Sequence, residues 1–136
     1  MLFFFGSVGA QAPSYSEERS DQYVREVYVP TSPKVQKGVY SPSPGSCLAS
    51  VQYWIPEFPT GVGVPNNVMP NTQVPSVGVA ILTTESYPGK NTGHVGQVVG
   101  VSVTTVRFRE CNKVSGQCGY REIQSDSSII RGYWTP

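Results

Sequence analysis

The sequence predicts an α+β domain in which one helix is followed by four to six antiparallel strands. Its 20 valines, against 3 leucines and 4 alanines, indicate a sheet, because β-branched residues favour strands while leucine and alanine favour helices. The 14 glycines and 12 prolines indicate many turns between the strands. A chain of 136 residues is long enough for one such domain and too short for two.

The strongest helix signal lies at residues 45–55. Ser46 is a typical N-cap residue, because its side-chain oxygen can accept a hydrogen bond from an N–H group of the first turn. Leu48, Val51 and Ile55 recur at helical spacing, and Pro56 ends the pattern. A loop rich in proline, glycine and asparagine is expected at 56–75.

Five segments after this loop have the pattern of strands. Short apolar runs predict strands at 77–82 and 93–101. An alternating pattern predicts a strand at 105–112, which is expected to pair with 120–123 across a hairpin. The segments are 77–82, 93–101, 105–112, 120–123 and 129–134. Together with the helix they predict a globular domain over residues 43–136.

Residues 1–42 have a different composition and are expected to form an arm or linker. An apolar run followed by Ala10-x-Ala12 fits either a secretory signal remnant at 1–12 or a short segment that packs on a partner protein. Residues 23–29 are the one strand candidate in the arm. The prolines beyond it indicate extended chain without a core-forming period.

Charge and composition exclude several classes of function. Ten lysines and arginines against nine acidic residues leave a net charge of +1, which excludes the strongly basic surface typical of a nucleic-acid-binding protein. No stretch approaches the ~20 apolar residues that span a bilayer, so no membrane span is expected. One histidine and scattered cysteines do not make a zinc site, and neither a metal nor another cofactor is expected.

The three cysteines predict one disulfide and one free thiol. Cys111 and Cys118 flank a polar hairpin loop and can reach the Cα separation of about 4–7 Å that a disulfide requires. Cys47 is then left over, as either an inert buried thiol or a reactive one. A structural disulfide favours an oxidising compartment.

Cys47 and His94 are candidates for nucleophilic catalysis. Cys47 lies in the first turn of the predicted helix, where backbone N–H groups and the helix dipole stabilise a thiolate and can donate to an oxyanion. His94 is the sole histidine, and a nucleophilic cysteine needs one base. The ordinary structural interpretation makes Cys47 a small buried apolar residue and His94 a hydrogen-bonded one.

Glu110 and Asn112 are expected to share one face of the strand at 105–112, in register with Val106 and Phe108. If the apolar pair is buried, the carboxylate and the carboxamide lie near the strand end, where either can orient a histidine ring. The alternative interpretation is a solvent-exposed Glu110.

In this order the motifs resemble those of CHAP domains, the cysteine- and histidine-dependent amidohydrolases and peptidases of the papain-like NlpC-type superfamily. The resemblance covers about residues 44–136. The segments that carry it are Gly45-Ser46-Cys47, Gly93-His94-Val95, Glu110-Cys111-Asn112 and Ile130-Arg131-Gly132-Tyr133. The chain departs from the family pattern at Ser46, where many CHAP domains have glutamine, and at 56–75, where a second helix is usual.

The resemblance implies a small papain-like domain whose N-terminal nucleophile helix packs on the antiparallel sheet. It implies that Cys47 is the nucleophile, that His94 is the base, and that Glu110 and Asn112 orient the histidine. The implied substrate is bacterial peptidoglycan, cut at a stem-peptide bond or at the amide to muramic acid, which places the protein outside the bacterial cytoplasm or in a phage virion. The candidate substrate-binding residues are Tyr53, Trp54 and Gly93.

Two other functions stay open at this point. One is a virion or structural assembly protein that uses a CHAP-like fold without hydrolysis, its N-terminal arm lying along a protein partner. The other is a cysteine peptidase that acts on a different amide. The presence of Cys47, His94 and Glu110 together favours an enzyme, because an inactive relative is expected to lose one of them.

Overall fold

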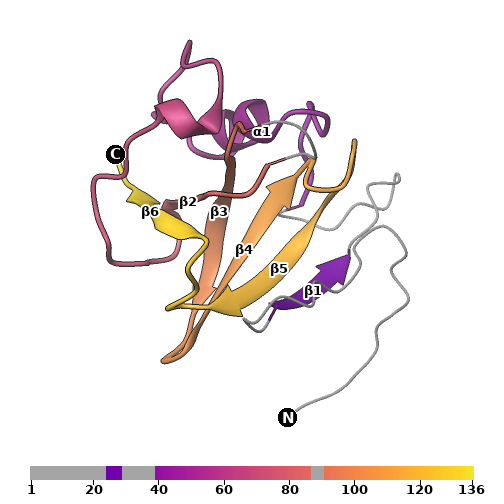
Figure 1. Cartoon of the computed structure of the whole chain (residues 1–136). Coiled ribbons are helices and arrows are strands. Elements are labelled where there is room, and N and C mark those ends of the chain that lie inside the picture. The colour runs from indigo at the N-terminus through magenta and orange to yellow at the C-terminus, as the bar shows by residue number, and fades with distance from the viewer. Residues whose placement is uncertain (1–23, 29–38, 87–90) are drawn as a thin grey trace.

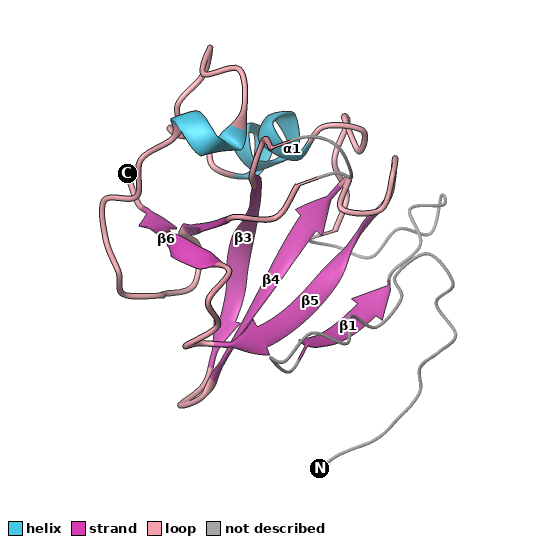
Figure 2. Ribbon diagram, in the orientation of Figure 1, coloured by secondary structure: helices cyan, strands magenta, loops and turns pink. Residues whose placement is uncertain are grey.

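A computed structural model describes residues 24–28, 39–86 and 91–136, and within them one α-helix packs on a six-stranded antiparallel sheet (Figures 1 and 2). The α+β expectation is therefore confirmed. The order of strands across the sheet is β1-β5-β4-β3-β2-β6. The strands are β1 (Val24–Tyr28), β2 (Ala80–Thr83), β3 (His94–Val101), β4 (Thr105–Cys111), β5 (Cys118–Gln124) and β6 (Ile130–Trp134). The helices are α1 (Cys47–Trp54) and the short 3-10 helix η2 (Pro65–Asn67).

The segment expected to be an arm contributes to this sheet. β1 pairs with β5 at the sheet edge, with Val24 opposite Ile123. Val39 is fully buried against Cys111 and Cys118. The signal-like segment 1–12 and most of the remaining arm lie outside the described residues.

Local sequence signals account for the bounds of α1. The Ser46 side chain accepts a hydrogen bond of 3.0 Å from the Ala49 N–H, as expected of an N-cap. At the other end the Ile55 N–H donates to the Val51 carbonyl, and Pro56 follows. The helix therefore begins at Cys47, which places this side chain in the first turn.

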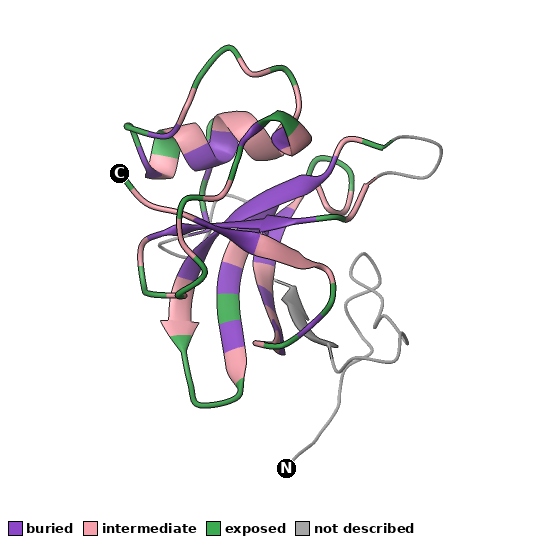
Figure 3. Cartoon of the chain, turned by 60° about the vertical axis from the view of Figure 1, so that its left-hand side comes forward, coloured by how far each residue is buried: buried purple, intermediate pink, exposed green. Residues whose placement is uncertain are grey.

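Two apolar clusters hold the helix and the strands together, and the buried residues concentrate in the strands between them (Figure 3). The cluster beneath the helix contains Val51, Ile55, Phe58, Val68, Ala80, Leu82 and Val95. The second cluster is formed by strand side chains that point away from the helix. It contains Val79, Ile81, Val98, Val106, Phe108, Ile123 and Tyr133. Because side chains alternate along a strand, β2 and β3 contribute to both clusters.

The strand expected at 77–82 begins three residues later, at Ala80. Gly78 has a φ of +100°, a left-handed conformation that regular strands do not contain. Val77 is two-thirds exposed, so this apolar residue belongs to the preceding loop. The side chains that β2 buries are those from Ala80 to Thr83.

Gly96 allows the neighbouring strand to approach β3 closely. A Cβ atom at this position would lie 2.7 Å from the Arg109 carbonyl oxygen and 2.8 Å from the Phe108 ring. Gly96→Ala is therefore expected to lower the free energy of unfolding by about 1–3 kcal/mol, as overpacking does in other cores. Urea unfolding of both proteins measures this difference.

Gly45→Ala is the matched control for this change, because a Cβ atom at Gly45 would meet no atom within 4 Å. Its free energy of unfolding is expected to stay within about 0.5 kcal/mol of the native value. Equal effects of the two substitutions would contradict the close approach at Gly96.

The antiparallel pairing brings the first residue of β3 beside the last residues of β4, with Gln97 opposite Arg109. α1 packs against both strands. Three parts of the chain that are distant in sequence therefore meet at one end of the sheet. Among the described residues, no helix has the length and apolarity needed to cross a membrane.

Candidate active site

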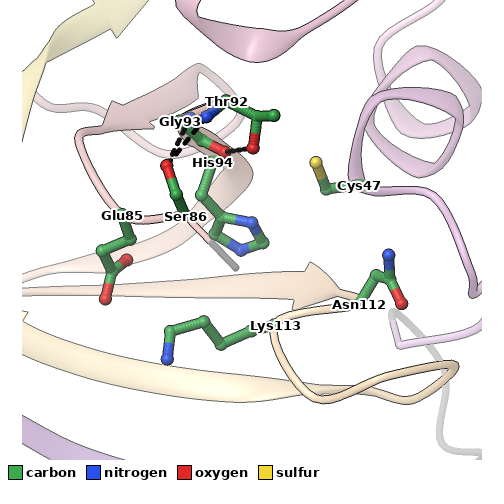
Figure 4. Close-up of a pocket in the computed structure, with 8 residues that line it drawn as sticks. All are labelled: Cys47, Glu85, Ser86, Thr92, Gly93, His94, Asn112 and Lys113. Carbon is green, nitrogen blue, oxygen red and sulfur yellow. Dashed lines mark hydrogen bonds between the residues drawn. The ribbon is translucent and has the colours of Figure 1, made fainter. Parts of the chain in front are cut away.

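One pocket at this end of the sheet contains Cys47 and His94 (Figure 4). Cys47 comes from the start of α1, is partly exposed and is a free thiol. His94 is the first residue of β3 and is only 5 % exposed. The eight residues that line the pocket are Cys47, Glu85, Ser86, Thr92, Gly93, His94, Asn112 and Lys113.

His94 connects the thiol to a buried carboxylate. Its Nε2 atom lies 2.8 Å from Oε1 of Glu110, whose side chain is fully buried. This contact engages one nitrogen of the ring and leaves Nδ1 without a role in binding Glu110, while Cys47 lines the same pocket as His94. A thiol and an imidazole at one pocket, with a carboxylate behind the imidazole, is an arrangement that can support nucleophilic catalysis.

The surroundings of His94 favour its protonated form. Burial lowers the pKa of the imidazole, but hydrogen bonds to Cys47 and Glu110 and the charges of both groups raise it to about 9. The imidazole therefore carries a proton at neutral pH.

Behind Glu110 lies a second ion pair that the sequence analysis missed. Arg121 is fully buried on β5, and its Nη2 atom lies 3.1 Å from Oε1 of Glu110. The same guanidinium binds Glu85 through two hydrogen bonds, of 2.7 and 2.5 Å. Glu85 follows β2 and lines the pocket.

Glu85 is a strongly acidic group within this site. Burial raises the pKa of its carboxyl, but the hydrogen bonds and charge of Arg121, helped by the charges of His94 and Lys113, lower it to about 2. Its stabilising ion pair is therefore complete above pH 4.5 and is lost as the pH falls through 2.

The hairpin register contains a signal that would have located Arg121. Cys111 stands opposite Cys118, which places Phe108 opposite Arg121. Directly opposed residues lie on the same face, so Arg121 shares the buried face of Phe108 and Glu110. No comparable local signal exists for Glu85, which lies 36 residues from Arg121 in sequence.

Ser86, Thr92 and Gly93, which precede β3, form another part of the pocket lining. Ser86 Oγ accepts hydrogen bonds of 2.9 Å from the N–H groups of Thr92 and Gly93. Gly93 has a φ of +76°, and a Cβ atom there would lie 2.3 Å from Oδ1 of Asn66. Gly93, a predicted substrate-binding residue, thus lies in the pocket and also allows the chain to turn sharply into His94.

Asn112 does not share the face of β4 with Glu110, because the strand ends at Cys111. Its φ of +69° is left-handed, which asparagine tolerates better than most residues, and this turns the chain out of the strand. Asn112 Oδ1 accepts a hydrogen bond of 2.8 Å from the Gly116 N–H, so the side chain shapes the hairpin loop. Asn112 lies at the pocket, while Glu110 makes the contact with His94.

Tyr53 and Trp54, predicted to bind substrate, are not among the residues that line this pocket. They follow Cys47 by about two helical turns, roughly 9–10 Å along the axis. The Trp54 indole donates to the Tyr40 carbonyl and lies 4.4 Å from the Arg109 guanidinium carbon, so it has a packing role. Tyr53 is half exposed and contacts the Tyr40 ring edge-to-face.

A disulfide fixes the end of the β4–β5 hairpin beside the site. It joins Cys111 to Cys118, whose Cα atoms are 4.0 Å apart and whose side chains are fully buried. Glu110 precedes the first cysteine, so the cross-link restrains the strand that carries the carboxylate. Cys47 is then the one thiol left by the three cysteines of the sequence.

In the part of the chain that the structure describes, no three histidine, cysteine or acidic side chains are grouped so as to hold a metal ion. The polar groups beside Cys47 instead form the hydrogen-bonded series His94, Glu110, Arg121 and Glu85. Comparisons of the chain with models of known families, with curated proteins and with solved structures found no match.

Proposed function

We propose that this protein is a cysteine amidohydrolase or peptidase that cleaves an amide bond of bacterial peptidoglycan. The observation that carries the proposal is that Cys47 and His94 line one pocket, while the buried Glu110 lies behind His94 with 2.8 Å between His94 Nε2 and Glu110 Oε1. The resemblance of the same segments to CHAP domains supports peptidoglycan as the substrate. A small papain-like domain is part of this proposal.

In the first half of the reaction, the Cys47 thiolate attacks the carbonyl carbon of the amide. The N–H groups of the first turn of α1 that lack a helical partner, those of Cys47 and Leu48, stabilise the oxyanion. The Ala49 N–H already donates to Ser46. As the C–N bond breaks, His94 gives its proton to the departing amine, and a thioester remains on the sulfur.

In the second half, a water molecule attacks the thioester while His94 accepts its proton. The C–S bond breaks, the carboxylic acid product leaves, and the proton held by His94 restores the starting pair. Glu110 holds the imidazole by Nε2 throughout. The full cycle consumes one amide and one water and needs no cofactor.

The experiment that tests the function is release of soluble fragments from purified peptidoglycan. The native protein is expected to release fragments whose masses identify the cleaved bond, and Cys47→Ala is expected to release none. A circular dichroism spectrum that matches the native one shows that the variant is folded.

Several wall chemistries should be tried in parallel, because stem peptides and cross-links differ between bacteria. Absence of release by the native protein from all of them would reject the proposed substrate. The assembly role or an enzyme for another amide would then take its place.

A further inference from the structure

Arg121 is a buried arginine that binds two carboxylates beside the pocket. It is fully buried, and its guanidinium carbon lies 5.0 Å from the centre of the Phe108 ring. Two carboxylates bind it from different elements: Glu85 after β2 and Glu110 on β4. A planar guanidinium can satisfy two such acceptors at once in fixed geometry, which a lysine cannot.

Two cationic side chains contact the same oxygen of Glu110. His94 from β3 and Arg121 from β5 both contact Oε1, whereas Oε2 is buried and has no hydrogen-bond partner. Among the described residues, Cys47 of α1, Glu85 and Lys113 are the other titratable groups that line the pocket. Arg121 is thus the permanently charged partner of Glu110, since His94 loses its charge when it gives up its proton.

We infer that Arg121 is a positioning residue of the catalytic group: clamped by Glu85 and the Phe108 ring, it fixes Glu110 Oε1 against His94. The inference rests on the proposed cysteine chemistry. A carboxylate that is no longer held against the ring stabilises protonated His94 less well. Cys47 then keeps its own proton and is a weaker nucleophile.

Alkylation of Cys47 by iodoacetamide tests this inference without any substrate. Cys47 is the one free thiol, so the rate of alkylation reports its thiolate directly. The rate is measured against pH on the acid side, and the quantity compared is the pH of half-maximal rate. The variants are Arg121→Met, Glu85→Gln/Arg121→Met, Arg121→Lys and Arg107→Met.

Loss of a positive charge makes every nearby group easier to protonate. In Arg121→Met the half-maximal pH is therefore expected to rise by about one pH unit or more. The double variant removes the Glu85 charge together with its partner, which avoids leaving that carboxylate unpaired, and the same direction is expected. If Arg121→Met does not fold, the half-maximal pH of the double variant tests the inference instead.

Arg121→Lys keeps the charge and is expected to restore the half-maximal pH to within about half a unit of the native value. Arg107→Met is the matched control, because Arg107 also lies over an aromatic ring, that of Tyr120, but is exposed and lines no part of the pocket. Its profile is expected to equal the native one.

A folded Arg121→Met or double variant with an unchanged or lower half-maximal pH would overturn the inference and leave Arg121 a purely structural ion pair. The outcome is separate from that of the peptidoglycan assay. A native protein that releases no fragments but shows the expected shift in alkylation keeps the role of Arg121 and loses only the substrate.

Discussion

His94→Gln is expected to lower the kcat for amide hydrolysis by at least about 10³-fold. Glutamine can still donate to Glu110, but it can neither take the proton of Cys47 nor protonate the departing amine. Because the imidazole acts on bond breaking more than on binding, KM is expected to change far less than kcat. Initial rates of fragment release at a series of substrate concentrations measure both constants.

The pH dependence of the native enzyme gives this prediction its second readout. Since the pKa of His94 is raised from 6.5 to about 9, the imidazolium persists through neutral pH and is lost as the pH rises through about 9. Activity is expected to fall there. The contribution of protonated His94 to the free energy of unfolding is complete below pH 6.5 and is lost as the pH rises through about 9.

Thermal unfolding followed between pH 6 and 10 should therefore show a decline in the native protein that His94→Gln lacks. Because the sequence contains one histidine, its imidazole NMR signals need no assignment and report the midpoint directly. A midpoint near 6.5 would contradict the coupling of His94 to Cys47 and Glu110.

Glu110→Ala is expected to lower both stability and turnover. The carboxylate is fully buried and binds His94 and Arg121 through one oxygen. Removing one partner of a buried ion pair typically costs about 3–5 kcal/mol of unfolding free energy. Loss of the group that orients the histidine is expected to lower kcat by about 10²- to 10⁴-fold. Urea unfolding and fragment release measure the two effects.

Two further variants separate charge from shape in this prediction. Glu110→Gln keeps the size of the side chain and is expected to retain more stability than Glu110→Ala while losing most of the activity. Glu57→Gln changes an exposed glutamate outside the pocket and is expected to leave both quantities unchanged. Full activity of Glu110→Gln would show that the negative charge has no part in catalysis.

The parts of the site that sequence analysis predicted are those with local causes. The cap at Ser46 and the stop at Pro56 fix the helix that starts at Cys47, because both act within one helical turn. The alternation along β4 places Glu110 on the buried face with Phe108. The same reasoning failed for Asn112, because Asn112 itself has a left-handed conformation and the strand ends one residue before it, at Cys111.

Other features could not be predicted from the sequence because they depend on distant partners. The Trp54 indole contacts Tyr40 and Arg109, which come from a segment before the helix and from β4. The pairing of β1 with β5 likewise joins residues about a hundred positions apart. Such contacts have no local periodicity from which they can be predicted.

The sequence by itself determined the α+β class, the helix that carries Cys47 and the strands that carry His94 and Glu110. Only the tertiary structure decided that these three residues meet, and that Glu85 and Arg121 lie behind them. The physical reason is that secondary structure follows from interactions between near neighbours, whereas a charged side chain is stable in the interior only beside partners that folding brings from elsewhere in the chain.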